Sequence, residues 1–419
     1  MDVGCVAPLS SLIDIKHGHP FSSRYFTKEP TDHILLTPRN FTKDQRLSFE
    51  QDATYYDGPI PDGFLLEDGD LLVVMTDLST EMAILGNAVI LQSGDLHKKF
   101  LHNQRIGKVI EKSGDTDRTF LMYLLDSYAV RKEVWVTATG STVLHTSPDK
   151  ILNIKVWVPG LPEQRRIAHI LSQWDHAISL VEELIAARQR RRKALAQRLL
   201  FGKKRFSRFV RSGAMRETRD PYPMDWDIPY IGEIAHQVSR RNKEDHPFPV
   251  LSCTKHQGLV DSARYFTKWA AAGKDLSKYK RVRRGMFVYA TNHIEEGSIG
   301  YQDLHDEALV SPMYTIFKTS ERIVDEFLYL ILKTDRYRRL FIINTNASVD
   351  RRGGLRWKDF ARIRVPVPSR EEQESIAHVF AIADQEIDLL RQQLTALWRQ
   401  KNGLMQRLFS GRSRVPGAG

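Results

Sequence analysis

Few residues of this 419-residue sequence have the types and spacing that enzyme chemistry requires. The nearest match to the Asn/Asp-Pro-Pro-aromatic loop of an amino-group methyltransferase is Asp220-Pro221-Tyr222-Pro223, which lacks the second adjacent proline. Neither a glycine-rich cofactor loop nor the Gly-x-x-x-x-Gly-Lys-Ser/Thr loop that binds nucleotide phosphates is present. Pro61-Asp62 and Pro148-Asp149 are not followed by the acidic-x-Lys pair of many metal-dependent nucleases. The sequence therefore predicts a chain without catalytic residues of its own.

The potential metal ligands do not form a site in the sequence. The 14 His show no HExxH or comparable spacing, and Cys5 and Cys253 stand too far apart for a cysteine-rich zinc site or a disulfide framework. We expect no metal and no cofactor on this chain. The N-terminus lacks a basic start followed by an apolar stretch, and no apolar run approaches the roughly 18 residues that cross a bilayer. We therefore expect a cytoplasmic protein that does not insert into a membrane.

Basic residues, in contrast, are abundant and lie among aromatic residues in several segments that we expect to be loops. The formal net charge of +11 favours a polyanionic partner, because a Lys or Arg placed on a phosphate releases a condensed counterion. Arg also suits bidentate contact with guanine edges, and Asn suits adenine. The candidates for contact with double-stranded DNA are Lys16, His17, Arg24, Arg39, Lys43, Arg46, Asn103, Arg105, Lys280, Arg281, Arg283, Arg284, Asn292, His293, Arg351, Arg352 and Arg356. For any single candidate, a solvated surface charge is the competing interpretation.

The strongest of these candidates is the pair Arg351-Arg352, because the glycines Gly353-Gly354 that follow let two guanidinium groups approach a DNA groove. A denser basic run extends from Arg188 to Arg205. It has three interpretations: it follows a DNA backbone, it faces a partner subunit, or it is the solvated face of a long helix. The sequence leaves these alternatives open.

An internal repeat indicates which elements must position the candidate residues. The segment 158–169 (Val-Pro-Gly-Leu-Pro-Glu-Gln-Arg-Arg-Ile-Ala-His) recurs as 367–378 (Val-Pro-Ser-Arg-Glu-Glu-Gln-Glu-Ser-Ile-Ala-His), an offset of 209 residues. The register holds without a gap as far as Gly202 and Gly411, which stand where a glycine that ends a helix is expected. Each half of the chain therefore consists of a variable domain followed by a similar helix.

Both repeated segments have the apolar period of a long helix that packs in a coiled coil, with steps of three and four over about five heptads. The seam residues are Ile167, Leu171, Trp174, Ile178, Val181, Ile185, Leu195 and Leu199 in the first helix, and Ile376, Phe380, Ala383, Ile387, Leu390, Leu394, Leu397, Leu404 and Leu408 in the second. Arg192 and Lys401 interrupt the two seams at equivalent places. Large residues opposite small ones, such as Trp174 and Ala383, would set the register, but one sequence does not show which residues face each other. Since the first helix must carry the chain between the domains and the second must return it, we expect an antiparallel pair. The alternative is that each helix lies separately on its own domain.

The rest of the chain mixes short β-rich runs with Gly, Pro and Asp punctuation, which is typical of an α+β fold. Gly69 and Gly285 each precede a short apolar strand. We therefore expect two α/β-mixed domains separated by two long helices that form an antiparallel coiled coil, related by an internal pseudo-twofold repeat. The expected boundaries are 1–158 for the first domain, 159–214 for the first helix, 215–367 for the second domain and 368–419 for the second helix.

These features resemble the DNA specificity subunits of type I restriction–modification systems over essentially the whole chain. The resemblance is carried by the Pro-x-x-x-Glu-Gln-x-x-Ile-Ala-His start of each helix, by the Gln-Arg-Leu-x-x-Gly end and by the two dissimilar domains. Arg370 and Glu371 replace the Leu161-Pro162 pair of the first copy, a departure that leaves the resemblance intact.

The resemblance implies that each variable domain is a target-recognition domain for one half of a split DNA sequence, while the helices fix the unread spacer. It implies two methyltransferase subunits as partners, which bring S-adenosylmethionine for adenine-N6 methylation, and restriction subunits with ATP and Mg where these exist. Since the two domains differ in sequence, we expect an asymmetric bipartite target. One alternative is a free-standing coiled-coil DNA-binding regulator without methyltransferase partners, and a second is an enzyme that acts alone.

Overall fold

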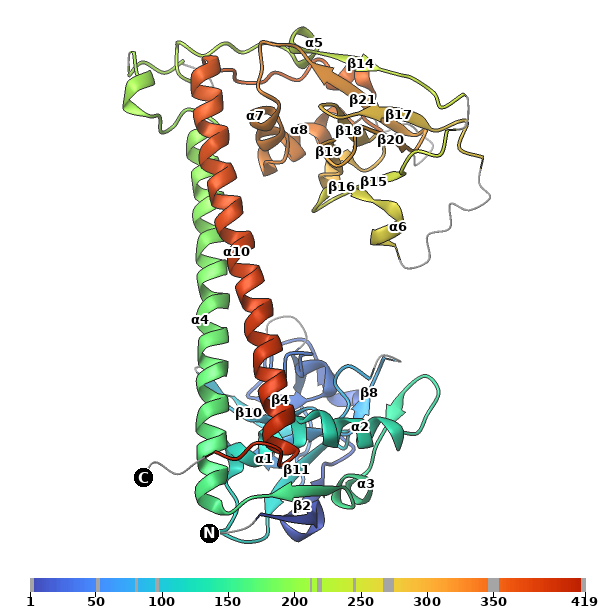
Figure 1. Ribbon diagram of the computed structural model, residues 1–419, viewed down its shortest axis with the longest axis vertical. Helices are drawn as coiled ribbons and strands as arrows, with labels where there is room; N and C mark the ends of the chain where they lie inside the picture. The colour runs from blue at the N-terminus through green and yellow to red at the C-terminus, as the bar shows by residue number, and fades with distance from the viewer. Residues whose placement is uncertain are drawn as a thin grey trace. The chain divides into compact units, whose positions relative to one another are not determined.

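The computed structural model describes residues 4–49, 53–79, 82–94, 98–211, 213–216, 221–243, 246–266, 275–345 and 354–415. The chain divides into two compact units, of which unit 1 is Met1–Glu183 with Gln392–Gly419 and unit 2 is Leu184–Arg391. Each unit consists of a mixed α/β domain and parts of two long helices, α4 (Leu161–Leu199) and α10 (Arg370–Phe409) (Figure 1). The expected α+β fold with two long helices is confirmed.

The domain of unit 1 is built on two sheets. Its strands are β1 (Cys5–Pro8), β2 (Ile13–His17), β3 (Phe26–Thr27), β4 (His33–Leu36), β5 (Thr54–Tyr56), β6 (Leu65–Leu66), β7 (Leu71–Val74), β8 (Thr76–Asp77), β9 (Ala88–Ile90), β10 (Lys99–His102), β11 (Ile106–Glu111), β12 (Leu144–His145) and β13 (Lys155–Val158). Its short helices are α1 (Arg118–Asp126), α2 (Tyr128–Val136) and α3 (Pro148–Leu152). One sheet has the order β2-β11-β7-β9, and the other has the order β3-β5-β4-β10-β6, in which β4 and β10 are parallel. Two smaller sheets pair β1 with β13 and β8 with β12.

The domain of unit 2 has one four-stranded sheet, β14-β21-β18-β19, and two two-stranded sheets, β15-β16 and β17-β20. The strands are β14 (Ala235–Val238), β15 (Leu251–Thr254), β16 (Gly258–Asp261), β17 (Lys280–Arg283), β18 (Phe287–Ala290), β19 (Ile299–Tyr301), β20 (Glu307–Val310) and β21 (Tyr314–Thr319). The short helices are α5 (Ile231–Ile234), α6 (Ser262–Tyr265), α7 (Asp325–Leu332), α8 (Asp335–Asn344) and α9 (Trp357–Phe360).

The two domains share one four-stranded sheet, which we call the frame sheet, and they differ in the strands that are added to it. The sheets β2-β11-β7-β9 and β14-β21-β18-β19 have the same strand order and are antiparallel throughout. In both, a glycine with positive φ, Gly69 or Gly285, precedes a fully buried strand, as the sequence predicts. A pair of helices follows the long strand in each unit, and the apolar core lies between these helices, the sheet and the ends of α4 and α10. The added strands, β3-β5-β4-β10-β6 in unit 1 and β15-β16 with β17-β20 in unit 2, are where the domains differ.

The helices α4 and α10 pack together and run antiparallel within each unit (Figure 1). In unit 1, Lys401 on α10 donates a hydrogen bond to Asp175 on α4 at 2.6 Å. In unit 2, Arg192 on α4 donates to Asp384 on α10 at 2.8 Å. The same 209-residue offset relates the two pairs, since it converts Asp175 into Asp384 and Arg192 into Lys401. The polar interruptions of both seams are therefore the places where opposite charges meet.

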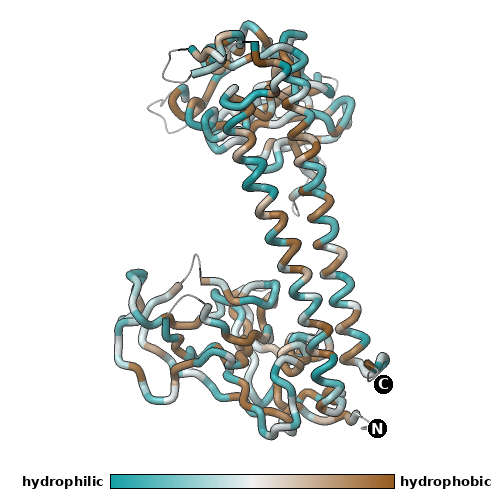
Figure 2. The backbone as a smooth tube through the Cα atoms, turned by 90° about the vertical axis from the view of Figure 1, so that its left-hand side faces the viewer, coloured by the Kyte–Doolittle hydropathy of each residue, from teal (hydrophilic) through white to brown (hydrophobic). Residues whose placement is uncertain are grey.

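The predicted seam residues of α4 and α10 are all buried or partly buried. The exposed apolar residues on these helices lie off the seam, and they are Leu180, Leu184, Ile382 and Leu389. Figure 2 shows apolar positions recurring along both helices between hydrophilic ones. Trp174 and Ala383 do not face each other, because the offset of 209 relates equivalent positions. Facing positions in an antiparallel pair have a constant sum, as in Asp175 with Lys401 and Arg192 with Asp384.

The helix ends lie where the sequence places them. The strand β13 ends at Val158 and α4 begins at Leu161, while α10 begins at Arg370 directly after Pro368-Ser369. Gly202 and Gly411 follow the last helical turns with φ of +68° each, a conformation that favours glycine. No helix in the described part of the chain is long and apolar enough to span a bilayer. The four domain boundaries given above stay predictions.

Candidate nucleic-acid interface

The repeated Glu-Gln pair at the start of each long helix forms a joint, which we define as Glu163 and Gln164 in unit 1 and Glu372 and Gln373 in unit 2. Both glutamates are buried, and each accepts hydrogen bonds from an arginine that follows the terminal glycine of the other helix. Arg414 donates to Glu163 at 2.7 Å, and Arg205 donates to Glu372 at 2.7 Å. These hydrogen bonds raise the pKa of the Arg205 guanidinium above its usual value. The glutamate of the motif therefore fastens the end of one helix to the start of the other.

The glutamine of each joint attaches the helix to the domain. The Gln164 side chain accepts from the backbone N–H of Asp117 at 2.9 Å, and the Gln373 side chain accepts from that of Val324 at 2.7 Å. Both donor positions precede the first domain helix that follows the frame sheet, α1 or α7. Each glutamine amide also donates to the carbonyl of the proline five residues earlier. The motif that marks the repeat in the sequence is therefore a structural connection between helix and domain.

In unit 1 the structure brings two predicted segments together. Lys16 and His17 end strand β2, and Arg105 lies in the turn that joins β10 to β11. The backbone N–H groups of His19 and Gln104 join these segments by hydrogen bonds of 2.8 and 3.1 Å. A Cβ atom on Gly18 would lie 2.1 Å from the Asn103 carbonyl oxygen, so this approach requires glycine.

Aromatic rings lie beside two basic side chains of this region. The Lys16 ammonium lies 5.0 Å from the ring centre of Phe64, and the Arg24 guanidinium lies 4.5 Å from that of Tyr25. We call Lys16, His17, Arg24 and Arg105, which are all exposed, the unit 1 basic cluster. These exposed cations lie beside aromatic rings in the domain that carries the additional five-stranded sheet. Such cations are suited to contact the phosphates and bases of DNA.

Other predicted residues of unit 1 have different surroundings. Asn103 is 6% exposed and its side chain accepts from the backbone of Arg105, so it shapes the turn. Arg46 forms an ion pair with Glu182 on α4. Arg39 and Lys43 are exposed on the surface near the short helix at 38–40, away from regular strands.

In unit 2 the basic segment Lys280–Arg283, which we expected to be a loop, forms strand β17. Its side chains are largely engaged by acidic neighbours on β20 and in the turn before it. Arg281 and Arg283 both pair with Glu307, and their hydrogen bonds lower the pKa of this carboxyl. Arg284 pairs with Asp306 at 3.0 Å. The Lys280 ammonium donates to the Tyr314 carbonyl at 2.6 Å, and burial followed by the charge of Arg241 lowers its pKa. These side chains stabilise the pairing of β17 with β20, so their positive charge is partly neutralised.

A second basic segment, which was not among the candidates predicted from the sequence, lies beside β17. Arg240, Arg241 and Lys243 are exposed, and backbone hydrogen bonds hold their segment against β17, including one of 2.7 Å from Arg281 to the Arg240 carbonyl. We call Arg240, Arg241 and Lys243 the unit 2 basic segment. Its signal in the sequence was the Arg-Arg-Asn-Lys run that follows strand β14.

Asn292 and His293 lie after β18, next to the segment that begins at Gly354. Asn292 is partly buried, and a Cβ atom on Gly354 would lie 2.7 Å from its side-chain oxygen. Arg356 is exposed at the start of α9. Arg351 and Arg352, the strongest candidates in the sequence, lie outside the described residues.

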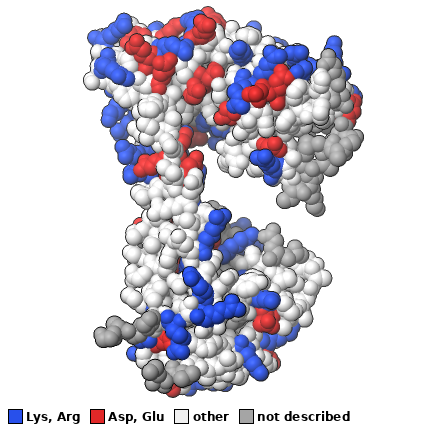
Figure 3. Space-filling view, viewed as in Figure 1, with Lys and Arg blue, Asp and Glu red and all other residues white. Residues whose placement is uncertain are grey.

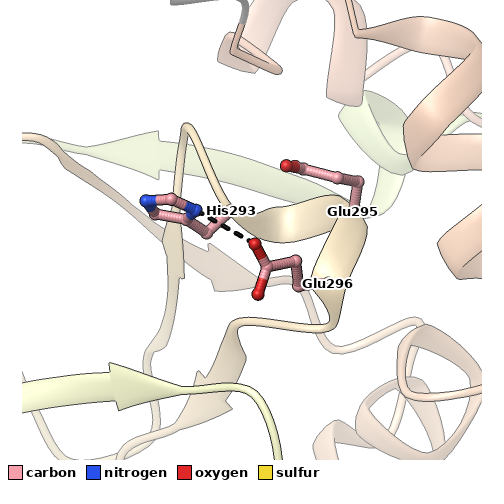
Figure 4. A group of neighbouring side chains, drawn as sticks. All are labelled: His293, Glu295 and Glu296. Carbon is pink, nitrogen blue, oxygen red and sulfur yellow. Dashed lines mark hydrogen bonds and ion pairs between the residues drawn. The ribbon is translucent and has the colours of Figure 1, made fainter. Parts of the chain in front are cut away.

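His293 also belongs to a group with Glu295 and Glu296, in which one ligand atom from each side chain lies within 4.8 Å of the others. Figure 4 shows the His293 ring turned toward the Glu296 carboxylate, with which it forms an ion pair at 3.4 Å, and the Glu295 carboxylate beside this pair. Acidic groups at a surface are common without a metal ion, and this arrangement contains an ion pair with an acidic neighbour.

Charge is distributed unequally between the units. Unit 2 holds 39 Lys and Arg against 26 Asp and Glu, whereas unit 1 holds 23 against 25, so the positive net charge of the chain belongs to unit 2. Figure 3 nevertheless shows Lys and Arg gathered on one face of unit 1, where Asp and Glu are few, and both signs mixed on unit 2.

A groove of about 1370 Å³ opens at the start of α10 in unit 2. It borders the joint and carries both charge signs together with apolar side chains. Its lining includes Arg205, Phe206, Arg208, Asp225, Arg322, Arg370, Glu371, Glu374 and Val379. Since carboxylates would repel a run of phosphates, this mixture suits a protein surface better than a DNA backbone.

Comparison with known proteins gives a consistent result at the level of sequence. The family model described as "Type I restriction modification DNA specificity domain" matches residues 64–187 and 227–399. The chain is 25% identical over 337 residues to the type I restriction enzyme MjaVIII specificity subunit of Methanocaldococcus jannaschii, covering 76% of each protein. It is 25% identical over 408 residues to the type I restriction enzyme EcoBI specificity subunit of Escherichia coli, covering 90% of this chain and 79% of that one.

Solved structures share the fold. The S subunit of a type I restriction–modification system from M. genitalium matches with a TM-score of 0.52 at 17% identity, covering 97% of this chain and 96% of that chain. A chain from a structure of complex assembly and conformational transition of the type I R-M system matches with a TM-score of 0.57 at 14% identity, covering 96% and 97%. At these identities the likeness concerns the arrangement of elements.

Proposed function

The chain belongs to the family of type I restriction–modification DNA specificity subunits, and from this premise we propose that it recognises an asymmetric bipartite DNA target. The domain of unit 1 reads one half of the target and the domain of unit 2 reads the other. The observation that carries the proposal is the shared frame sheet, which two repeat-related helices hold and to which each domain adds different strands. Because the two frame sheets are equivalent but the strands added to them differ, the two domains suit two half-sites of different sequence.

The DNA contacts proposed for each domain follow from charge and exposure. In unit 1 the basic cluster of Lys16, His17, Arg24 and Arg105 contacts the duplex, and in unit 2 the basic segment of Arg240, Arg241 and Lys243 does so. Arg351 and Arg352 remain proposed contacts. Guanidinium groups supply both bidentate base contacts and phosphate contacts, which differ in their effect on specificity.

The chemistry of the complex lies on its partners. Two methyltransferase subunits with S-adenosylmethionine methylate adenine at N6, and restriction subunits with ATP and Mg act where they exist. The specificity subunit itself binds none of these cofactors. The groove beside Arg205 and Arg370 is the proposed docking place for one methyltransferase subunit, because its mixed charges and apolar side chains suit a protein surface. We expect the assembly to be cytoplasmic.

Methylome sequencing of cells with and without the gene tests the proposal. We expect one split adenine-methylated motif with two unlike halves that disappears with the gene. A continuous or perfectly palindromic motif would contradict the proposal.

Co-purification separates the proposal from the alternative, a free-standing DNA-binding regulator. A stable complex of one such chain with two methyltransferase subunits supports the specificity role. A chain that binds DNA but retains no methyltransferase supports the regulator.

A further inference from the structure

One carboxylate in unit 1 joins three elements. Asp175 on α4 accepts hydrogen bonds from the Lys401 ammonium on α10 at 2.6 Å and from the Tyr123 hydroxyl on α1 at 2.5 Å. The Lys401 ammonium also lies 5.1 Å from the centre of the Tyr123 ring, and Lys401 is only 2% exposed. We call Tyr123, Asp175 and Lys401 the Asp175 junction. Its hydroxyl belongs to the domain, and its two charged groups belong to the long helices.

Among the residues that the structure describes, the equivalent carboxylate in unit 2 shows only the helix-to-helix part of this arrangement. Asp384 pairs with Arg192, but aligning the start of α7 with that of α1 places Leu330 where α1 has Tyr123. Leucine has no hydroxyl to offer a carboxylate. The Arg192 side chain is also 32% exposed, against 3% for that of Lys401, so the unit 2 pair is better solvated. The connection from domain to carboxylate is therefore a feature of unit 1.

We propose that Tyr123 is a positioning residue that fixes the angle of the unit 1 domain on the two long helices. A domain tilts on its helices only if the bonds between them break, and a hydrogen bond to a charged carboxylate is among the stronger ones. The inference rests on the proposed function, in which tilting lets a half-site displaced by one base pair still be read. Tyr123 therefore contributes to discrimination between spacer lengths and touches no base.

The variant Tyr123→Phe removes the hydroxyl and keeps the ring. The chain is assembled with its methyltransferase partners, and methylation rates are measured on DNA with the native spacer and with spacers one base pair longer and shorter. We expect the ratio of the rate on altered spacers to that on the native spacer to rise about tenfold, because a mis-spaced target no longer has to break this bond. A general loss of stability would lower all three rates together.

Tyr301→Phe is the matched control. It removes a tyrosine hydroxyl that donates to Asp325 at 3.1 Å within the domain of unit 2, where neither partner lies on a long helix. The control should leave the spacer ratio at the wild-type value. A Tyr123→Phe ratio equal to that of the control would overturn the proposal.

Hydrogen exchange of the variant gives an outcome that does not depend on DNA. Backbone amides of α1 should exchange about tenfold faster in Tyr123→Phe than in the wild type, while those of β11 stay unchanged. Unchanged exchange in α1 overturns the positioning role even if the target is bipartite. If the wild type methylates no bipartite target, the proposed function fails, and the exchange result still decides whether the junction holds the domain.

Discussion

The buried glutamates of the two joints show how single residues hold the fold. Glu372 is fully buried and Arg205 satisfies it with two hydrogen bonds, while Trp226 donates a third at 3.2 Å. Removing one partner of a buried pair leaves an uncompensated charge, which costs more than the pair itself contributes. At the other joint, 49% of the Arg414 side chain is exposed, so water can replace part of its interaction with Glu163.

The joints therefore predict unequal effects for equivalent substitutions. Arg205→Met should lower the free energy of unfolding of unit 2 by about 3 kcal/mol, because Glu372 would keep its charge without its partner. Arg414→Met, the matched change, should lower that of unit 1 by clearly less, as for a solvated pair. Urea unfolding followed by hydrogen exchange in each unit measures both values. A smaller effect at Arg205 than at Arg414 would show that the glutamates are not held as described.

Asp126, at the end of α1, gives a prediction for pH. Burial raises the pKa of this carboxyl from about 4 to about 7, although the Ala88 N–H donates to it at 2.8 Å. A raised carboxyl pKa means that the folded state binds the proton more tightly than the unfolded state between these values. Ionisation of Asp126 should therefore lower the free energy of unfolding of unit 1 as pH rises from about 4 to about 7.

The variant Asp126→Asn isolates this contribution, because the amide keeps the hydrogen-bond acceptor and cannot ionise. Relative to the wild type, it should gain on the order of a few kcal/mol in unfolding free energy between pH 5 and pH 8. Denaturant unfolding of both proteins at the two pH values provides the measurement. An equal difference at both values would mean that Asp126 does not titrate with a raised pKa.

At the scale of elements, much of the helical architecture was predictable and its register was not. The seam, the proline-marked starts and the glycine ends follow from spacing and backbone chemistry along one segment. Which residues of α4 face which of α10 depends on how two distant segments meet, and comparison of repeats gives only equivalent positions. Trp174 and Ala383 are such equivalent positions. The ion pairs Asp175–Lys401 and Arg192–Asp384 supply the register directly.

The helix pair predicts how spacer length is set. Inserting seven residues at equivalent places in the middle of α4 and α10 should lengthen each helix by roughly 10 Å and preserve the seam. The preferred spacer should grow by about three base pairs at roughly 3.4 Å per pair, with the bases of both half-sites unchanged. Methylome sequencing of the insertion variant reads both properties. Altered half-site bases would contradict the role of the helices as a spacer.

At the scale of the whole molecule, the sequence predicted two dissimilar domains on a repeat but could not predict their surfaces. Strand order and the engagement of Arg281 and Arg283 by Glu307 depend on pairings between distant segments. The number of basic residues in the sequence therefore overstated the contribution of β17 to DNA binding, because its cations have acidic neighbours. This number also did not show that Arg240 and Arg241 would be available for DNA binding, although the fold leaves both exposed.

The concentration of positive charge in unit 2 predicts where salt dependence arises. The double variant Arg240→Ala with Arg241→Ala should weaken binding to specific and unrelated DNA alike. It should also reduce the slope of log K against log salt by roughly 0.9 for each phosphate that the variant no longer neutralises. Filter binding between about 50 and 200 mM salt, a range in which such slopes are steep, gives the values. An unchanged slope would remove the unit 2 basic segment from the proposed interface.

The central claim is that two separate readers in one chain each recognise one half of the target. Its most direct test is the methylome of cells whose copy of the chain carries the first domain, residues 1–158, of a relative with a different target. The account predicts that one half of the methylated motif changes to that of the donor, while the other half and the spacer stay as they were. A motif in which both halves change, or in which neither does, would contradict it.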